Sequence, residues 1–219
     1  ADRPFVAEKY RATFEVIMGA SKVLEFNACD CKEAEARLLA KAFAYCGGLD
    51  SLALSNNPFG DAGLAVLAPA LPRCRKILLE VCGFGTAGAR VLAEALPANA
   101  ALEQVMLSDN KGMGDEGVVA LAEALPRCSK LMRLSLRKTS CGDRGASALA
   151  AALPSCGIVC LHLDYNLVGD AGAKELAASM ASNTVNDLDL DNNRLTEEGK
   201  AAVRKAWREA GKPGNKLGL

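Results

Sequence analysis

The 219-residue sequence has few aromatic residues, no net charge and no long apolar run. Aromatic residues make up 5% of the chain, and Lys and Arg together number 26, as do Asp and Glu. A balanced charge removes the bulk electrostatic attraction on which nucleic-acid and membrane-surface binders depend. No stretch approaches the roughly 18 apolar residues of a transmembrane helix. The composition therefore predicts a chain without a nucleic-acid partner and without a transmembrane segment.

Cysteine, in contrast, is frequent, with nine residues. An odd number is a poor basis for a disulfide framework. Four cysteines recur three residues after the last apolar residue of a helical pattern, namely Cys46, Cys74, Cys128 and Cys156. We interpret these as structural positions for a small, weakly polar side chain. Unpaired thiols favour a reducing intracellular compartment, and because the chain begins at Ala1, an organelle reached after removal of a targeting segment is an open alternative.

Glycines at intervals of 25 to 29 residues divide the chain into repeats. They are Gly63, Gly88, Gly117, Gly145, Gly172 and Gly199. Each begins an Ala- and Leu-rich pattern, such as the one with Leu121 and Leu125, and apolar residues at i and i+4 place one stripe on one face of a helix. Proline lacks the backbone N–H and disfavours helix before it. The helices are therefore expected to stop at Pro72, Pro97, Pro126 and Pro154.

A short alternating segment precedes each helical pattern, as at Leu52 and Leu54. Apolar residues at i and i+2 predict a strand. Three residues after each pair lies a residue that can bond backbone groups where the chain turns away from the strand. These residues are Cys29, Asn57, Cys82, Asn110, Thr139, Asn166 and Asn193. The unit is thus strand, turn and helix, repeated seven times, and the third unit is short before Ile77 and expected to be irregular.

The pattern L-x-x-L-x-L-x-x-N/C, followed by G-D-x-G-A-x-x-L-A-x-A-L, resembles the ribonuclease-inhibitor-like subclass of leucine-rich repeats over about residues 20–210. Ribonuclease inhibitor, Ran GTPase-activating protein and the sensor domains of NOD-like receptors share this type of repeat. The resemblance implies an α/β solenoid, curved like a horseshoe, with an inner parallel sheet of about seven strands and helices outside. One unit cannot bury its apolar face alone, so stacked units build the core.

Residues 1–219 are predicted to form a single domain with a cap at each end. Residues 1–20 are expected to be an N-terminal cap helix, residues 21–199 the seven repeats, and residues 200–219 a C-terminal cap and tail. Trp207 is expected to cover the last core layer, and Leu217 and Leu219 are compatible with an eighth strand. The N-terminal cap rests on apolar residues at helical spacing outside the repeat phase, namely Val6, Tyr10, Phe14 and Ile17.

The inner face of the sheet is the usual binding surface in this family, so residues beside the core leucines form the candidate site. Leu78 and Met106 predict an apolar centre. A basic strip is expected at Arg133, Arg137 and Lys138, and an acidic end at Asp164, Asp187, Asp189 and Asp191, with His162 and Tyr165 beside it. Apolar anchors flanked by orienting charges suit a protein-binding patch. The same residues are also compatible with a solvated sheet face.

Two arrangements on this face suggest sharper chemistry. Ser135, His162 and Asp189 share one column, as in a hydrolase triad, but no feature of the sequence supplies an oxyanion hole or a pocket. Cys160, His162 and Asp164 alternate along one strand at about 6.8 Å spacing, which is too wide for all three to bind one ion comfortably. The sequence therefore predicts no catalytic residue, no metal site and no cofactor.

The repeated Gly-Asp pairs at Asp61, Asp115, Asp143 and Asp170 predict helix starts rather than calcium or phosphate loops. An Asp near a helix N-terminus satisfies open N–H groups and suits the helix dipole. The helices themselves are rich in alanine, which is explained either by helix propensity or by a smooth outer surface that lies against a larger multi-subunit assembly.

These observations predict a non-catalytic scaffold or accessory subunit that binds another protein on its concave face. The alternative, by resemblance to Ran GTPase-activating protein, is a regulator of a small GTPase. Against it, Arg204, Lys205, Arg208 and Lys212 make the C-terminal end basic, whereas that family often carries an acidic tail. A hydrolase that uses Ser135, His162 and Asp189 is the most remote alternative.

Overall fold

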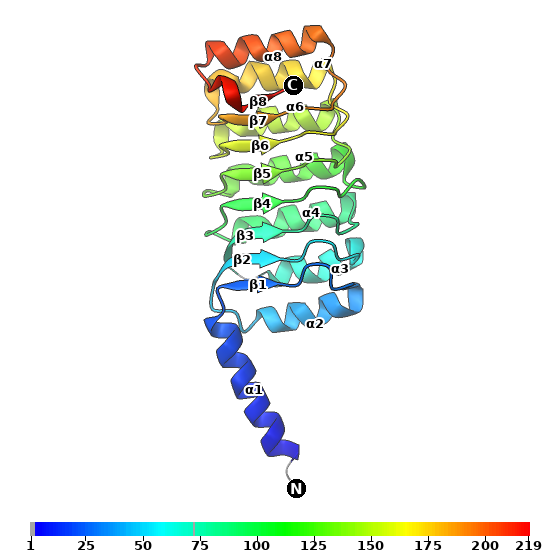
Figure 1. Cartoon of the computed structure of the whole chain (residues 1–219), viewed down its shortest axis with the longest axis vertical. Coiled ribbons are helices and arrows are strands. Elements are labelled where there is room, and N and C mark those ends of the chain that lie inside the picture. The colour runs from blue at the N-terminus through cyan, green and yellow to red at the C-terminus, as the bar shows by residue number, and fades with distance from the viewer. Residues whose placement is uncertain (1–2, 72) are drawn as a thin grey trace.

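The computed structural model describes residues 3–71 and 73–219, and a single parallel sheet of eight strands runs through it. The strands lie side by side in chain order, so each repeat adds the next strand (Figure 1). They are β1 (Val23–Glu25), β2 (Leu49–Ala53), β3 (Cys74–Leu78), β4 (Gln104–Met106), β5 (Arg133–Ser135), β6 (Cys160–His162), β7 (Asp187–Asp189) and β8 (Leu217–Gly218). The predicted α/β leucine-rich-repeat solenoid is confirmed, including the eighth strand.

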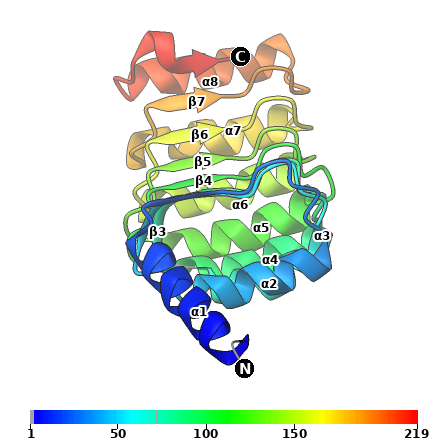
Figure 2. The ribbon, with the colours of Figure 1, turned by 60° about the horizontal axis from the view of Figure 1, so that its bottom comes forward.

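Helices α2 to α8 lie in a row over one face of the sheet and leave the other face uncovered (Figures 1 and 2). The helices are α1 (Arg3–Ala20), α2 (Glu33–Phe43), α3 (Gly60–Leu67), α4 (Thr86–Ala95), α5 (Gly114–Ala124), α6 (Asp143–Ala152), α7 (Asp170–Ser179) and α8 (Glu197–Glu209). Helices α4, α5 and α6 each continue into a 3₁₀ turn that contains Pro97, Pro126 or Pro154. The prolines therefore lie inside the final turn instead of after it, whereas Pro72 lies outside the described residues.

The turn after each strand is held by the ladder of polar side chains that the sequence predicts. Asn110 is fully buried; its Oδ1 accepts hydrogen bonds from the backbone N–H groups of Cys82 and Gly83, and its Nδ2 donates to the carbonyls of Leu79 and Leu107. Asn57, Asn166 and Asn193 make the corresponding bonds between their own repeats and the preceding ones. Each ladder residue thus satisfies backbone groups that burial would otherwise leave unpaired.

The aspartates at the helix starts cap the helix of the next repeat, not their own. The Oδ1 atom of Asp143, at the start of α6, accepts hydrogen bonds from the backbone N–H groups of Gly169 and Gly172, at 2.7 and 2.9 Å. Asp61 and Asp115 bond the following repeat in the same way. A Cβ atom at Gly172 would lie 2.8 Å from this carboxylate oxygen, which explains why glycine recurs there. The expectation that each Asp starts its own helix was wrong in this respect.

The third repeat is irregular, as its short sequence predicts. The helix that leads into it, α3, has 8 residues, against 10 or 11 in α4 to α7. Strand β3 spans five residues from Cys74, against three in β4 to β7, and its register with β2 extends to Leu49↔Cys74. A pocket of about 350 Å³ opens beside this repeat, between residues of the outer helices such as Pro69, Val91 and Ala95.

The two ends of the stack differ. At the C-terminus Trp207 is 1% exposed, and its Nε1–H donates to the carbonyl of Pro213 at 2.9 Å, so the expected cover of the last core layer is present. At the N-terminus α1 forms, but it points away from the stack (Figure 1). Tyr10, Phe14 and Ile17 are 74%, 42% and 59% exposed, and the side chain of Val6 lies outside the described residues. Phe14 packs edge-on against Tyr45, just after α2, with ring centroids 5.6 Å apart, and Met18 is buried. Tyr10 and Ile17 do not cover the first repeat as expected.

Candidate functional site

The uncovered face of the sheet, here called the strand face, carries the candidate residues in aligned columns. The central column runs Glu25, Ala53, Leu78, Met106, Ser135, His162 and Asp189, each paired in register with the next. A second column includes Arg133, Cys160 and Asp187, also in register. The predicted alignment of candidate residues on neighbouring strands is therefore present.

The apolar centre of the strand face is less exposed than expected. Leu78 and Met106 are neighbours on β3 and β4, and both are half-buried. Their column neighbours Ala53 and Ser135 are buried, each 3% exposed. The apolar surface that Leu78 and Met106 expose is therefore flanked by the smaller side chains of Ala53 and Ser135.

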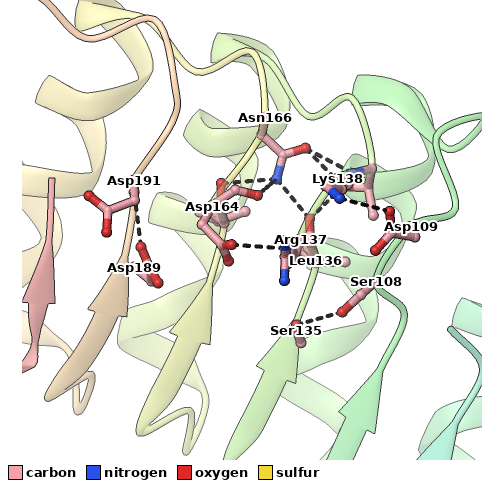
Figure 3. Close-up of polar contacts among 12 residues, drawn as sticks. Ser108, Asp109, Ser135, Leu136, Arg137, Lys138, Asp164, Asn166, Asp189 and Asp191 are labelled. Carbon is pink, nitrogen blue, oxygen red and sulfur yellow. Dashed lines mark hydrogen bonds and ion pairs between the residues drawn. The ribbon is translucent and has the colours of Figure 1, made fainter.

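Beside this centre, Arg137, Asp164 and Tyr165 form a contact cluster (Figure 3 shows Arg137 and Asp164). Arg137 Nε lies 3.1 Å from Asp164 Oδ2, an ion pair without an aligned hydrogen bond. The guanidinium carbon of Arg137 lies 4.6 Å from the ring centroid of Tyr165, within cation–π range. Burial and the nearby Asp189 raise the pKa of the Asp164 carboxyl, while Arg137 opposes the rise. The cluster thus holds an exposed aromatic ring, 47% accessible, against a fixed cation.

The backbone directs Lys138 and Tyr165 outward. Asp109, Lys138 and Tyr165 each directly precede a ladder residue and have positive φ angles between 51° and 62°, a conformation that costs non-glycine residues about 1–2 kcal/mol. Lys138 Nζ lies 3.5 Å from Asp109 Oδ1 and 5.3 Å from the Tyr165 ring centroid. Two residues of the basic strip are therefore paired within the chain, Arg137 with Asp164 and Lys138 with Asp109.

Sequence reasoning missed Leu167, which is 40% exposed next to Tyr165. The two residues line a shallow pocket of about 270 Å³ together with Lys111, Lys138 and Asn192. The sequence does distinguish Leu167. It directly follows the ladder residue Asn166, at a position where other repeats have Pro58, Lys111 or Ser140.

The residues of the remote hydrolase alternative lie in register but do not form a triad. The hydroxyl of Ser135 is buried and bonds Ser108 Oγ at 3.0 Å. Asp189 Oδ1 accepts the backbone N–H of Asp191 at 2.9 Å (Figure 3). His162 Nε2 faces Cys160 instead of Ser135. A nucleophile–base–carboxylate relay needs hydrogen bonds from Ser to His and from His to the carboxylate, and none of those bonds is present among the described residues.

Three possible metal ligands meet on the strand face, two from β6 and one from β7. Cys160 Sγ lies 3.2 Å from His162 Nε2, and His162 Nε2 lies 4.0 Å from Asp187 Oδ1. The third residue comes from the neighbouring strand β7, whereas Asp164 of the expected set pairs with Arg137. Burial raises the pKa of the Cys160 thiol; Arg133 opposes this rise and Asp187 adds to it. The distance expected between the Cys160 and His162 side chains from the strand spacing is larger than the distance in the structure, because the imidazole ring turns back toward the cysteine.

A family model described as "Leucine Rich repeat" matches residues 49–68 and 98–122. The two matched segments fall within the strand–turn–helix units of the leucine-rich-repeat solenoid, while membership of the ribonuclease-inhibitor-like subclass stays a prediction. Within the described residues, none of the helices has the length and hydropathy of a membrane-crossing segment.

No curated protein matches the sequence. A solved structure of actin-binding site 2 of leiomodin-1 is similar at 14% identity, over 91% of this chain and 86% of that chain, with a TM-score of 0.42. The complex of Rad7 and Elc1 from yeast is similar at 13% identity, over 89% of this chain and 71% of that chain, with a TM-score of 0.28. At such scores neither likeness says what this chain binds.

Proposed function

We propose that the chain is a non-catalytic interaction scaffold that binds a partner protein on its strand face. The observation that carries the proposal is the cluster of Arg137, Asp164 and Tyr165. Tyr and Arg are enriched among the residues that dominate binding energy at protein interfaces. Here Tyr165 is exposed and stacked against Arg137, which Asp164 holds in place. A side chain that is already ordered loses less conformational entropy on binding.

The rest of the strand face fits the same role. Leu78 and Met106 add half-buried apolar surface on adjacent strands, and Lys138, Asp189 and Asp191 supply charges of both signs at the rim. An apolar centre with a charged rim is the usual anatomy of a protein–protein interface. Ion pairs within the chain, such as Lys138 with Asp109, weaken the long-range field of these charges. The charges therefore serve to orient a bound partner more than to attract a distant one.

The test starts with affinity purification of the intact protein from its native source and identification of what it retains by mass spectrometry. The affinity of the purified partner is then measured for wild type, Tyr165→Ala and Tyr10→Ala. Tyr10 is also exposed, at 74%, but lies on α1 away from the strand face. We expect Tyr165→Ala to weaken binding about 30-fold, equivalent to about 2 kcal/mol, and Tyr10→Ala to leave it unchanged.

Three further variants separate the two faces of the solenoid. Leu78→Asp and Met106→Asp place a charge on the strand face, and Val119→Asp places one on α5, on the helix side. The proposal expects loss of binding in the first two with a folded chain by circular dichroism, and binding retained in the third. Loss only in Val119→Asp would move the interface to the helices and contradict the proposal.

The alternative suggested by resemblance, a regulator of a small GTPase, makes a separate prediction. The purified chain would then accelerate GTP hydrolysis by its GTPase partner in a turnover assay, whereas a scaffold would bind its partner without changing that rate.

A further inference from the structure

Cys160 is the one cysteine of the chain that occupies no recurring position of the repeat core. Cys29 and Cys82 are ladder residues, and the position two residues after the ladder holds Cys31 and Cys141 where other repeats have Phe59 or Val168. The remaining structural cysteines follow the helices, namely Cys46, Cys74, Cys128 and Cys156. Cys160 instead lies on the strand face, in register with Arg133 and Asp187. Repeat architecture therefore does not explain a thiol at this position.

The chain's single histidine lies beside this thiol. The ligand atoms of Cys160, His162 and Asp187 all lie within 4.8 Å of one another. We propose that Cys160, His162 and Asp187 form a three-ligand site for Zn²⁺ on the strand face. Thiolate, imidazole and carboxylate are the three side-chain ligand types that zinc takes in proteins, and the mixed set disfavours Ca²⁺ and Mg²⁺, which take oxygen ligands.

The geometry requires only small movements. In a tetrahedral zinc site with bonds of about 2.0–2.3 Å, neighbouring ligand atoms lie roughly 3.4–3.6 Å apart. Here the sulfur–nitrogen distance is 3.2 Å and the nitrogen–oxygen distance is 4.0 Å. The nitrogen–oxygen gap, and a sulfur–oxygen gap of no more than 4.8 Å, require movement of the Asp187 side chain, which is 24% exposed. The strands themselves need not move, because β6 and β7 already pair Cys160 with Asp187.

The surroundings support the proposed ligand roles. Oδ1 of Asp187 faces His162, while its Oδ2 lies 3.3 Å from Lys216 Nζ, so one oxygen is free to bind metal and the other is held from the outer shell. Asp164 and Asp189 add negative charge near the site. They offset the positive charges of Lys216 and of Arg133, which lies beside Cys160.

Three protein ligands leave the fourth zinc position for water or for an atom of another molecule. Solvent reaches the site through His162 and Asp187, whose side chains are 29% and 24% exposed, whereas Cys160 is 3% exposed. The zinc site does not rest on the proposed scaffold function, since it concerns ligands that belong to this chain alone. On binding, the thiol of Cys160 gives its proton to solvent and the resulting thiolate bonds the ion.

The test is Co²⁺ and Zn²⁺ titration of the purified full chain, fully reduced and freed of metal. Co²⁺ reports thiolate coordination through its sulfur-to-metal charge-transfer absorption, and Zn²⁺ is then added to displace it. The proposal expects saturation at one ion per chain with this band present. Cys160→Ser should abolish the band and weaken Zn²⁺ binding about a hundredfold, the upper end of the loss seen when even outer-shell groups are removed.

Two further variants make the result specific. His162→Gln should weaken Zn²⁺ binding to a similar extent while the far-ultraviolet circular dichroism stays that of wild type. Cys29→Ser removes the exposed thiol of the first repeat and should change neither the band nor the stoichiometry. A band that survives in Cys160→Ser, affinity unchanged in His162→Gln, or only weak binding of several ions per chain would overturn the proposal.

Discussion

The two ends of the solenoid differ in how they cover the apolar face of the terminal repeat. The last repeat is closed by α8, whose Val203 and Trp207 are buried, and by β8, which extends the sheet. The first repeat keeps Leu38 on α2 at 65% exposure, and Tyr10 and Ile17 of α1 remain largely accessible. A repeat buries its apolar face only against neighbours. A terminal helix therefore continues the core when its apolar residues fall at the positions of the repeat, as in α8, and does not when they fall elsewhere, as in α1.

The largest effect expected from this comparison is at the C-terminal cap. Trp207→Ala should lower the free energy of unfolding by about 3–5 kcal/mol, as other buried Trp or Phe truncations do. The matched change at the other end, Tyr10→Ala, should stay within about 0.5 kcal/mol, because its ring is exposed. Urea unfolding followed by circular dichroism measures both. Equal losses at the two ends would show that α1 is packed in solution.

A smaller loss is expected for leucines on the two sides of the same comparison. Leu136 is fully buried, and Leu136→Ala should cost about 2–5 kcal/mol. Leu38→Ala, in the first repeat, should cost about 0.5 kcal/mol or less, because the exposed side chain leaves no cavity. The midpoints of thermal unfolding for the two variants provide the measurement, and a Leu38→Ala loss as large as that of Leu136→Ala would contradict the open first repeat.

The capping aspartates allow a third comparison, between an interior junction and the first one. Asp143→Ala removes the acceptor for two backbone N–H groups of the next repeat and should cost about 0.5–2 kcal/mol, the usual range for a helix cap. Glu33 holds the equivalent position in the first repeat, but it bonds Arg37 of its own helix. Glu33→Ala should therefore change stability much less in a urea titration. Equal effects would show that Glu33 also caps its neighbour.

The smallest effect concerns pH at the junction of α7 and α8. Hydrogen bonds from the Thr196 hydroxyl and backbone N–H, at 2.5 and 2.8 Å, lower the pKa of the Asp170 carboxyl. Because the folded-state pKa lies below the unfolded value of about 3.9, the stabilisation is present above that value and is lost as the pH falls through the folded-state pKa. Carboxyl-carbon NMR titration should show Asp170 titrating below the value of about 3.9 of a free aspartate, and Thr196→Ala should raise its pKa.

The sequence predicts the parts of this molecule that are set by periodicity. Paired residues such as Leu52 and Leu54 place the strands, and the ladder position of Asn110 follows from the same spacing. Periodicity also brings His162 into register with Ser135 and Asp189. These predictions held because they depend only on the position of a residue within its repeat.

Side-chain choices between neighbouring strands could not be predicted in the same way. His162 can reach partners on either neighbouring strand or along its own strand, since strands lie about 4.8 Å apart, and the structure shows it against Cys160 and Asp187. Likewise, an Asp at a helix start is close to two helix N-termini, its own and the next. The direction of α1 was not predictable either, because helical spacing at Tyr10 and Phe14 defines an apolar side but not what packs on it.

Aspartates from the preceding unit cap α4, α6, α7 and α8, and this gives the stack a direction. The unit of α6, for example, brings Asp143 for its successor and receives Asp115 from its predecessor at Gly142 and Gly145, whereas α4 begins with Thr86 and brings no carboxylate for α5. A complete unit inserted into or deleted from the part of the array between α5 and α8 therefore leaves each junction with a matching carboxylate and backbone N–H, whereas a partial unit leaves an acceptor without its donors. In this part of the array, the number of repeats can change by whole units without a new type of junction between them.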